Sequence, residues 1–428
     1  MNKSMSIFHA CCKSIKHYFD SCFCKILEKV TKVDEDRFFC ISFFGNTYGD
    51  DLKPICDYIR QNHPNAKITW AFTSKVYNQY AKYEQHAVRF PSLACYISLY
   101  RSKYIISDSR FFDPTMAYRK RKAQVYMLTW HGTALKKIEK DIIEQQALLY
   151  LNRAINDGKN CDVMISNSDF MSTIYRKSFW FNGSIKKVGS PRNDIFFSSQ
   201  TKYIQEVRQA FNIPDEAKII LYAPTFRQEG IDQSFAAYDI DLQRFKSTIE
   251  KKYGGRWVVV YRLHPNLSCH GEECIRRAKR LFPDFIDASY YPSMQQLLCA
   301  TDILVSDYSS VMFDFMSTGR PCFIYTKDKV QYETVRGIYL DINALPFIHL
   351  DSNEDIENAI NGIDVTVYRQ QVEKFRKKIG YTEDGHAAEN TYKVLTSIDN
   401  TMSIIHLDEI ANLNTYLFGN KNNSIVSV

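Results

Sequence analysis

The sequence predicts an α/β protein with two successive doubly wound domains, each a parallel sheet covered by helices on both faces. The chain has 428 residues, which at roughly 150 residues per domain is enough for two large domains. Short, continuously apolar runs alternate with segments of helical periodicity, a pattern typical of parallel strands that are buried on both faces. The alternation pauses near the middle of the chain and then restarts, which indicates two sheets rather than one.

The first 30 residues predict a basic amphipathic helix, which we assign to residues 1–32. Five lysines and two acidic residues give the segment a net charge of +3. Apolar residues recur at 4-3-4-3-4 spacing and so share one stripe of a helix: Phe8, Cys12, Ile15, Phe19, Cys22 and Ile26. Such a helix can lie in the interface of an anionic membrane. It can equally dock on the body of the protein, and the pattern leaves both alternatives open.

The composition excludes several classes of protein. Twelve cysteines in a chain of this length are too sparse for a disulfide scaffold. The net charge of +7 is too weak to indicate a nucleic-acid partner. No uncharged apolar stretch reaches the roughly 18–20 residues of a transmembrane helix, and the N-terminus lacks the continuous apolar core of a secretory signal. We therefore expect a cytoplasmic protein with reduced cysteines.

The first domain is expected over residues 33–198. Its strands are predicted at residues 37–44, 67–72, 103–107, 124–130 and 162–166. Its helices are predicted near residues 51–61, 92–101, 144–156 and 168–180.

The second domain is expected over residues 199–400, after a polar stretch at 198–202. Its strands are predicted at residues 218–222, 257–261, 302–305 and 322–325. Its helices are predicted near residues 241–252, 271–281, 293–300 and 310–317. Residues 352–400 are expected to form helices that close this domain, and residues 401–428 to form a tail.

A histidine follows one of the predicted strands. Doubly wound domains bind ligands at the carboxyl ends of their strands, and His131 stands there, before Gly132, Thr133 and Lys136. An imidazole with an ordinary pKa near ~6.5 suits proton transfer near neutrality. The alternative is a packed, hydrogen-bonded histidine, and Lys136 favours an edge that faces an anion.

Two motifs of the second half suit a phosphate. Arg262 and His264 follow the strand at 257–261, and arginine can bind phosphate through two hydrogen bonds. Ser309 and Ser310 open a helix, where backbone N–H groups and the helix dipole favour an anion. The alternatives are an arginine paired with a carboxylate and ordinary helix capping.

Other charged residues lie at turns or strand ends. Taken singly they are typical of turns; together, Arg192, Arg227 and Arg262 would suit a diphosphate. The remaining members of this set are Asp194, Asp307 and Asp314. The dinucleotide-binding, P-loop and α/β-hydrolase motifs are all missing from the sequence.

The order of these motifs resembles the CDP-glycerol glycerophosphotransferase family, the teichoic-acid primases and polymerases, over residues 37–395. The motifs are Trp130-His-Gly-Thr133, Gly189-Ser-Pro-Arg-Asn-Asp194, Tyr222-Ala-Pro-Thr-Phe-Arg227, Arg262-Leu-His-Pro265, Ser306-Asp-Tyr-Ser-Ser310, Phe313-Asp-Phe315, Arg320-Pro321 and Arg336-Gly337. The resemblance implies a GT-B fold of two Rossmann-like domains. It also implies transfer of glycerol phosphate, or a related polyol phosphate, from a CDP-activated donor to an acceptor hydroxyl, with release of CMP.

The resemblance also implies roles for the candidate residues. His131 would be the general base, and Arg262 and His264 would hold the donor diphosphate. Ser309 and Ser310 would contact that diphosphate, with Arg227, Asp307 and Asp314 as further donor-site residues. The acceptor side and the rest of the site would comprise Gly132, Thr133, Lys136, Arg192 and Asp194. Cations and helix dipoles could neutralise the phosphates, so we expect no obligatory metal and no cofactor.

One segment departs from the family pattern. Residues 384–390 lack the arginine that the family usually carries there, which puts a donor-binding role of this segment in doubt. Family acceptors are lipid-linked, which favours a peripheral position of the protein on the inner face of the cell membrane. The alternatives are a GT-B glycosyltransferase that uses a nucleotide sugar and a non-catalytic scaffold of a surface-polymer complex.

Overall fold

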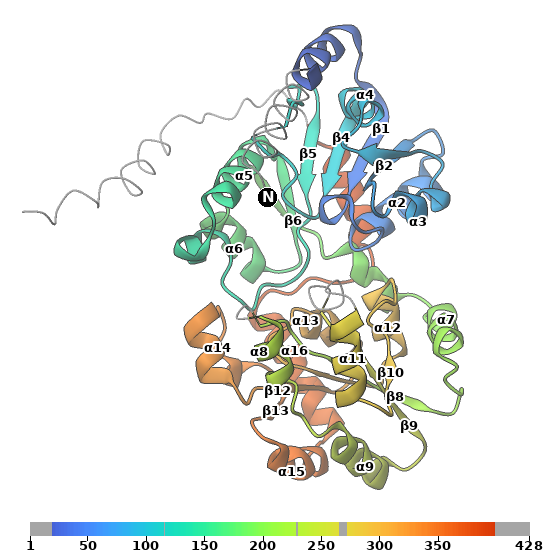
Figure 1. The fold of residues 1–428 in the computed structure, drawn as a ribbon, viewed down its shortest axis with the longest axis vertical. Coiled ribbons are helices and arrows are strands. Elements are labelled where there is room, and N and C mark those ends of the chain that lie inside the picture. Colours follow the sequence, from blue (N-terminus) through green and yellow to red (C-terminus); the bar gives the residue numbers. More distant parts are fainter. Residues whose placement is uncertain (1–18, 115, 228–229, 265–271, 399–428) are drawn as a thin grey trace, which may run out of the picture.

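The structure is a computed structural model that describes residues 19–114, 116–227, 230–264 and 272–398. Two lobes lie one above the other, each built on one parallel sheet with helices packed around it (Figure 1). The predicted α/β class with two parallel sheets is therefore confirmed.

The first sheet has seven parallel strands in the order β3-β2-β1-β4-β5-β6-β7. They are β1 (Asp34–Ile41), β2 (Lys67–Thr73), β3 (Ala87–Phe90), β4 (Ser102–Ser107), β5 (Val125–Leu128), β6 (Val163–Ser166) and β7 (Ser184–Lys187). Its helices are α2 (Leu52–Asn62), α3 (Tyr77–Tyr80), α4 (Leu93–Arg101), α5 (Leu148–Asn160) and α6 (Asp169–Ser178). Apolar clusters pack against both faces of this sheet.

The second sheet has six parallel strands in the order β10-β9-β8-β11-β12-β13. They are β8 (Lys218–Ala223), β9 (Trp257–Tyr261), β10 (Ile286–Asp287), β11 (Ile303–Ser306), β12 (Cys322–Tyr325) and β13 (Ile348–Leu350). The following helices are α7 (Thr201–Phe211), α8 (Ile231–Ala237), α9 (Leu242–Tyr253), α11 (Glu272–Leu281), α12 (Met294–Ala300), α13 (Val311–Phe315), α14 (Lys329–Arg336), α15 (Ile356–Asn361), α16 (Val365–Lys378) and α17 (Ala387–Thr396).

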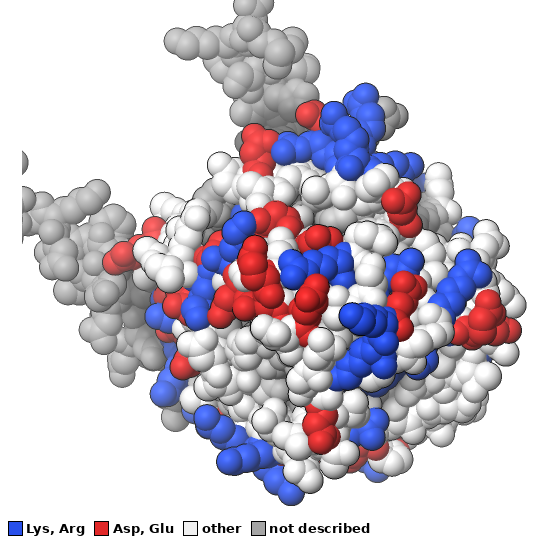
Figure 2. Space-filling model, turned by 90° about the horizontal axis from the view of Figure 1, so that it is seen from below, with Lys and Arg blue, Asp and Glu red and all other residues white. Residues whose placement is uncertain are grey.

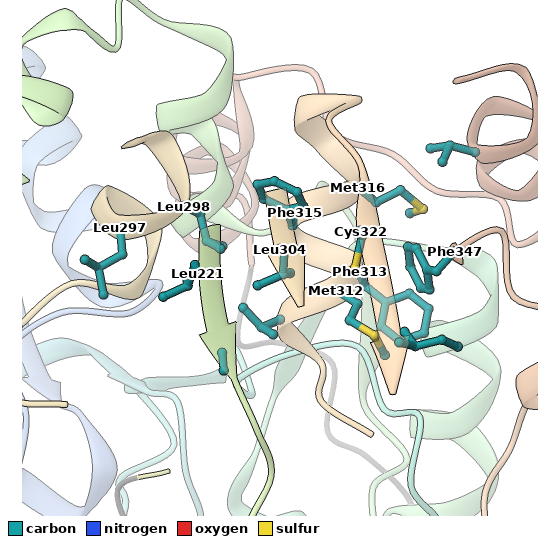
Figure 3. Close-up of a cluster of buried hydrophobic side chains, with 14 of the residues drawn as sticks. Leu221, Leu297, Leu298, Leu304, Met312, Phe313, Phe315, Met316, Cys322 and Phe347 are labelled. Carbon is teal, nitrogen blue, oxygen red and sulfur yellow. The ribbon is translucent and has the colours of Figure 1, made fainter. Parts of the chain in front are cut away.

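The core of the second domain consists of two apolar clusters, one on each face of its sheet. Figure 3 shows Leu298 of α12, Leu304 of β11 and Phe313 of α13 within one cluster of buried side chains. The domain surface that points away from the first domain carries Lys and Arg interspersed with Asp and Glu (Figure 2). Apolar packing therefore stabilises the interior of this domain. On the surface shown, positive and negative side chains are mixed, so no large patch carries charge of one sign.

Helix starts follow the local sequence. Ser92, Ser168, Asp241 and Ser293 stand at the N-caps of α4, α6, α9 and α12, and each side chain accepts a hydrogen bond from a backbone N–H in the first turn. These caps satisfy donors that a helix leaves without an intrahelical partner.

Several strands differ from the prediction. The strand predicted at 37–44 ends at Ile41, because Phe43 and Phe44 adopt positive φ and turn the chain. The short strands β3, β7, β10 and β13 were not predicted. All four lie at sheet edges, and β10 has only two residues. Such strands lack the continuous apolar run by which buried strands are recognised.

The last described helix returns to the first domain. In α17, Leu395 is buried in a cluster with Phe38 and Ile55 of the first domain, and Tyr392 stacks on His63 with ring centroids 4.0 Å apart. The expectation that all of residues 352–400 close the second domain is therefore wrong for this helix, because its apolar face packs on α2. The domain boundary between residues 198 and 199 stays a prediction.

Residues 19–30 form a helix at the end of the first domain remote from the second (Figure 1). Cys24 and Leu27 are buried against the first domain. Of the predicted stripe, Phe19 and Ile26 are 67% and 57% exposed, beside Val30 at 69%; Phe8, Cys12 and Ile15 lie outside the described residues. No helix in the described part of the chain is long and apolar enough to cross a membrane.

A buried ion-pair network, the Asp51–Arg192–Asp314 brace, connects the two domains. Arg192 lies in a 3-10 helix at Pro191–Phe197, and its Nη1 donates to Oδ2 of Asp51 at the start of α2 (2.7 Å). Its Nε and Nη2 donate to the carboxylate of Asp314 in α13 (3.1 and 3.0 Å). The three side chains are 2–7% exposed, so solvent screens this brace little.

Breaking the brace should destabilise the protein strongly. Arg192→Met leaves Asp51 and Asp314 buried without their counter-charge, and we expect the free energy of unfolding to fall by about 3 kcal/mol. Urea denaturation measures this change. The matched control is Lys187→Met, which removes an ion pair with Asp169 whose two side chains are 36% and 68% exposed and which should cost less than about 1 kcal/mol. Equal losses in the two variants would contradict a structural role for the brace.

Candidate functional site

His131 is held in a tight turn that follows β5. The neighbouring Trp130 has a φ of 61° and Gly132 a φ of 140°, and the second value suits glycine because it has no Cβ. The His131 ring lies against Trp130 and Phe43, with ring centroids 4.3 and 5.2 Å away. The imidazole therefore has a fixed orientation at the carboxyl edge of the first sheet.

The hydrogen bond of His131 sets its tautomer. Nδ1 lies 3.0 Å from the backbone oxygen of Asp108, and because a carbonyl oxygen can only accept, Nδ1 carries the proton. Nε2 then has the lone pair. Burial lowers the pKa of His131 below its ordinary value, so the imidazole is neutral near pH 7 and can accept a proton.

Two side chains that the sequence analysis missed hold this turn. Asp108 follows β4, and its carboxylate accepts from the backbone N–H of Phe43 (2.7 Å) and from the hydroxyl of Ser42. Arg110 is buried, pairs with Glu139 and Asp157, and lies 5.8 Å from the ring centroid of Trp130. One signal in the sequence could have pointed to them: the polar turn Ser107-Asp108-Ser109 at the carboxyl end of the strand predicted at 103–107.

The second domain meets the histidine turn at Ser310. A Cβ placed on Gly132 would lie 2.9 Å from Oγ of Ser310 and 3.9 Å from Nη2 of Arg192. Ser310 is the N-cap residue of α13, and its side chain makes no capping hydrogen bond there. Ser309 Oγ accepts from the backbone N–H of Val311 (3.3 Å). The structure thus brings Ser310, Gly132 and the brace together, as the sequence predicted for residues at strand ends.

Arg262 and His264 lie at the carboxyl end of β9. Arg262 Nη1 donates to the backbone oxygen of Tyr291 (2.8 Å), and in the part of the chain that the structure describes no carboxylate forms an ion pair with it. Burial lowers its pKa to about 10. Burial, together with the charge of Lys136, lowers the pKa of His264 to about 4. A half-buried guanidinium without a carboxylate partner is a candidate anion-binding group.

Arg227 and Asp307 have a structural role. Arg227 donates to Asp307 (2.8 Å) and Asp328 (2.7 Å), and its guanidinium lies about equally close to the rings of Tyr308 and Tyr332, 5.1 and 5.0 Å from their centroids. Asp307 also accepts from the backbone N–H of Thr225 (2.9 Å). Because their charges are matched internally, we interpret both as residues that hold the ends of β8 and β11 together, rather than as direct donor contacts.

Three other predicted residues have structural partners. Asp194 accepts from the backbone N–H groups of Ala387 and Ala388 (2.9 and 2.8 Å) at the start of α17, and Asp314 belongs to the brace. Thr133 is buried and its Oγ1 accepts from Asn167 Nδ2 (2.9 Å). The structure therefore places these three behind the site. No group of three or more His, Cys, Asp or Glu in the described ranges is arranged to hold a metal.

Curated relatives are teichoic-acid enzymes. The chain is 29% identical to the teichoic acid poly(glycerol phosphate) polymerase of Bacillus subtilis (strain 168) over 81% of this chain and 47% of that protein. It is 29% identical to the teichoic acid glycerol-phosphate transferase of Staphylococcus aureus (strain NCTC 8325), over 88% of this chain and 96% of that protein. The chain thus spans about half the length of the Bacillus polymerase and nearly all of the Staphylococcus transferase.

A solved structure shares the fold. The wall teichoic acid polymerase TagF matches with a TM-score of 0.72 and 23% identity, over 92% of this chain and 98% of that one. This likeness confirms the predicted GT-B arrangement of two Rossmann-like domains.

A family match covers residues 23–397. The resemblance predicted from the ordered motifs is therefore confirmed. The chain belongs to the CDP-glycerol:poly(glycerophosphate) glycerophosphotransferase family.

Proposed function

We propose that this protein transfers glycerol phosphate, or a related polyol phosphate, from a CDP-activated donor to a hydroxyl of a lipid-linked acceptor, in the synthesis of a teichoic acid or another surface polymer. The observation that carries the proposal is Arg262, a half-buried cation without a carboxylate partner among the described residues, in the domain that packs against the His131 turn. The names of the relatives and a TagF variant soaked with CDPG support the choice of donor.

The geometry suggests the following step. Nε2 of His131 takes the proton of the acceptor hydroxyl, and the oxygen attacks the phosphorus that carries glycerol. A new P–O bond forms while the bond from this phosphorus to the bridging oxygen breaks, and CMP leaves with the electron pair. Arg262, His264 and the two serines at α13 neutralise the charge that develops on the phosphates. Positioning and charge neutralisation supply most of such catalysis.

The proposed base can be tested directly. His131→Ala should lower kcat for CMP release from CDP-glycerol by about 10²- to 10⁴-fold, because the acceptor proton loses its receiver. Donor affinity, measured by calorimetry, should stay near the wild-type value. His63→Ala, at the end of α2, is the matched control. Wild-type turnover in the His131 variant would rule out this assignment, and turnover of a nucleotide sugar alone would favour a glycosyltransferase.

His264 should respond to the donor. In the free protein its pKa is lowered to about 4, so the ring is neutral at pH 7 and can donate one hydrogen bond. A bound diphosphate favours the imidazolium, and CDP-glycerol should raise this pKa by one unit or more. Nitrogen-15 NMR of the histidines, assigned by the signal lost in His264→Asn, measures the shift. An unchanged pKa at saturating donor would exclude contact between His264 and the phosphates.

We further propose that the helix at residues 19–30 binds the inner face of the cell membrane and keeps the protein at the membrane that carries the lipid-linked acceptor. Docking and membrane contact are compatible here, since Cys24 and Leu27 face the protein while Ile26 and Val30 are exposed. Lys25 and Lys29 are exposed on the same helix and suit anionic lipid.

Vesicle sedimentation tests this membrane contact. Ile26→Ser combined with Val30→Ser should lower binding to phosphatidylglycerol vesicles by about tenfold or more, because two aliphatic side chains no longer insert. The control combines Val330→Ser and Val367→Ser, two exposed valines of the second domain. The proposal fails if both double variants sediment like the wild type.

A further inference from the structure

Lys136 belongs to the first domain but is held against the second. Residues 135–137 pair with residues 337–339 in an antiparallel bridge, in which Lys136 stands opposite Ile338. The backbone N–H of Lys137 donates to the oxygen of Gly337 (3.1 Å), and that of Tyr339 donates to the oxygen of Leu135 (2.8 Å). The backbone of Lys136 is thus fixed on both sides at the domain interface.

The ammonium group of Lys136 lies among groups of the second domain. It is 6.0 Å from the ring centroid of Tyr332, and no carboxylate of the described chain forms an ion pair with it. Asp307 is the acidic group that acts on it, but the carboxylate of Asp307 already binds Arg227 and Thr225. Lys136 therefore brings a positive charge to the interface without a dedicated counter-charge.

This charge reaches the predicted diphosphate site. The His264 ring lies near the ring of Phe226, with centroids 6.2 Å apart. The next residue, Arg227, lies 5.0 Å from the centroid of the Tyr332 ring, which the Lys136 ammonium also approaches, at 6.0 Å. Arg262 stands two residues before His264 at the end of β9, and the charge of Lys136 helps to lower the pKa of His264. Three nitrogen groups from two domains thus converge on one region. A lysine ammonium binds phosphate as a compact point charge with three donors.

We propose that Lys136 is a donor-binding residue that reaches across the domain interface to a phosphate of the CDP-activated substrate held by Arg262 and His264. The inference rests on the proposed function and deepens it, because it moves Lys136 from the acceptor side to the donor site. Donor binding then engages both domains at once.

The first test is donor affinity measured by calorimetry with CDP-glycerol. Lys136→Met should weaken binding by about 10- to 100-fold, the range of a hydrogen bond to a charged group. Lys136→Arg keeps the charge and should lose much less. Lys137→Met is the matched control, because Lys137 belongs to the same bridge but its side chain is exposed. CMP has a single phosphate, and its affinity should fall less than that of CDP-glycerol.

The second test is the pH dependence of donor affinity. The pKa of Lys136 is lowered to about 8, mainly by burial; Asp307 opposes this shift, and Arg336 and Arg227 contribute to it. Above pH 8 the free protein loses this positive charge, so the affinity of the wild type should fall by up to tenfold per pH unit. Of its neighbours, His264 has a pKa near 4 and that of Tyr332 is raised above its ordinary value. Because the pKa of Arg262 is about 10, Lys136→Arg should bind nearly equally well from pH 7 to about 9.

The outcomes separate the two proposals. Equal CDP-glycerol affinity in the wild type and in Lys136→Met, with both folded by circular dichroism, would overturn the role of Lys136 alone. The same decline above pH 8 in Lys136→Arg would do so as well. A wild-type protein that binds neither CDP-glycerol nor CMP would overturn the proposed function itself.

Discussion

The buried guanidinium of Arg192 is the interaction on which the site geometry depends. It binds one carboxylate from each domain, Asp51 and Asp314. Removing ions from water is costly, and only complete pairing with good geometry offsets that cost. The brace is therefore most stable at one relative position of the two domains. At that position Ser310 contacts the Gly132 turn, so the predicted base and the hydroxyl-rich turn become parts of one site.

The arginines fall into two groups by their partners. Arg110, Arg192 and Arg227 are each matched by two or more carboxylates, and their charges are used within the fold. Arg262 binds only a backbone oxygen among the described residues. A cation whose charge is already balanced gains little from a ligand phosphate, whereas one buried without a counter-charge gains much. This contrast is the basis on which we propose Arg262, and not Arg227, as a donor contact.

The sequence predicted the buried strands well, because each is a continuous apolar run with one structural solution. It also placed His131 and Arg262 just after such strands, and the structure has them there; their roles stay a prediction. It could not separate Arg227 from Arg262, since both stand at strand ends and only the fold shows that Asp307 and Asp328 pair with the first. For the same reason it misplaced α17: an amphipathic helix shows that one face is buried, but not against which sheet.

Both histidines are neutral in the free protein, but for different physical reasons. His131 has its Nδ1 proton fixed by a backbone oxygen, so donor binding need not change its readiness to accept a proton. The low pKa of His264 arises from burial and the nearby ammonium of Lys136, and a diphosphate would reverse the second cause. Because Lys136 and His131 belong to the same stretch of chain, and both are already held in place, a donor that binds Lys136 would lie beside a base whose position is set in advance. Such preorganisation is what positioning contributes to catalysis.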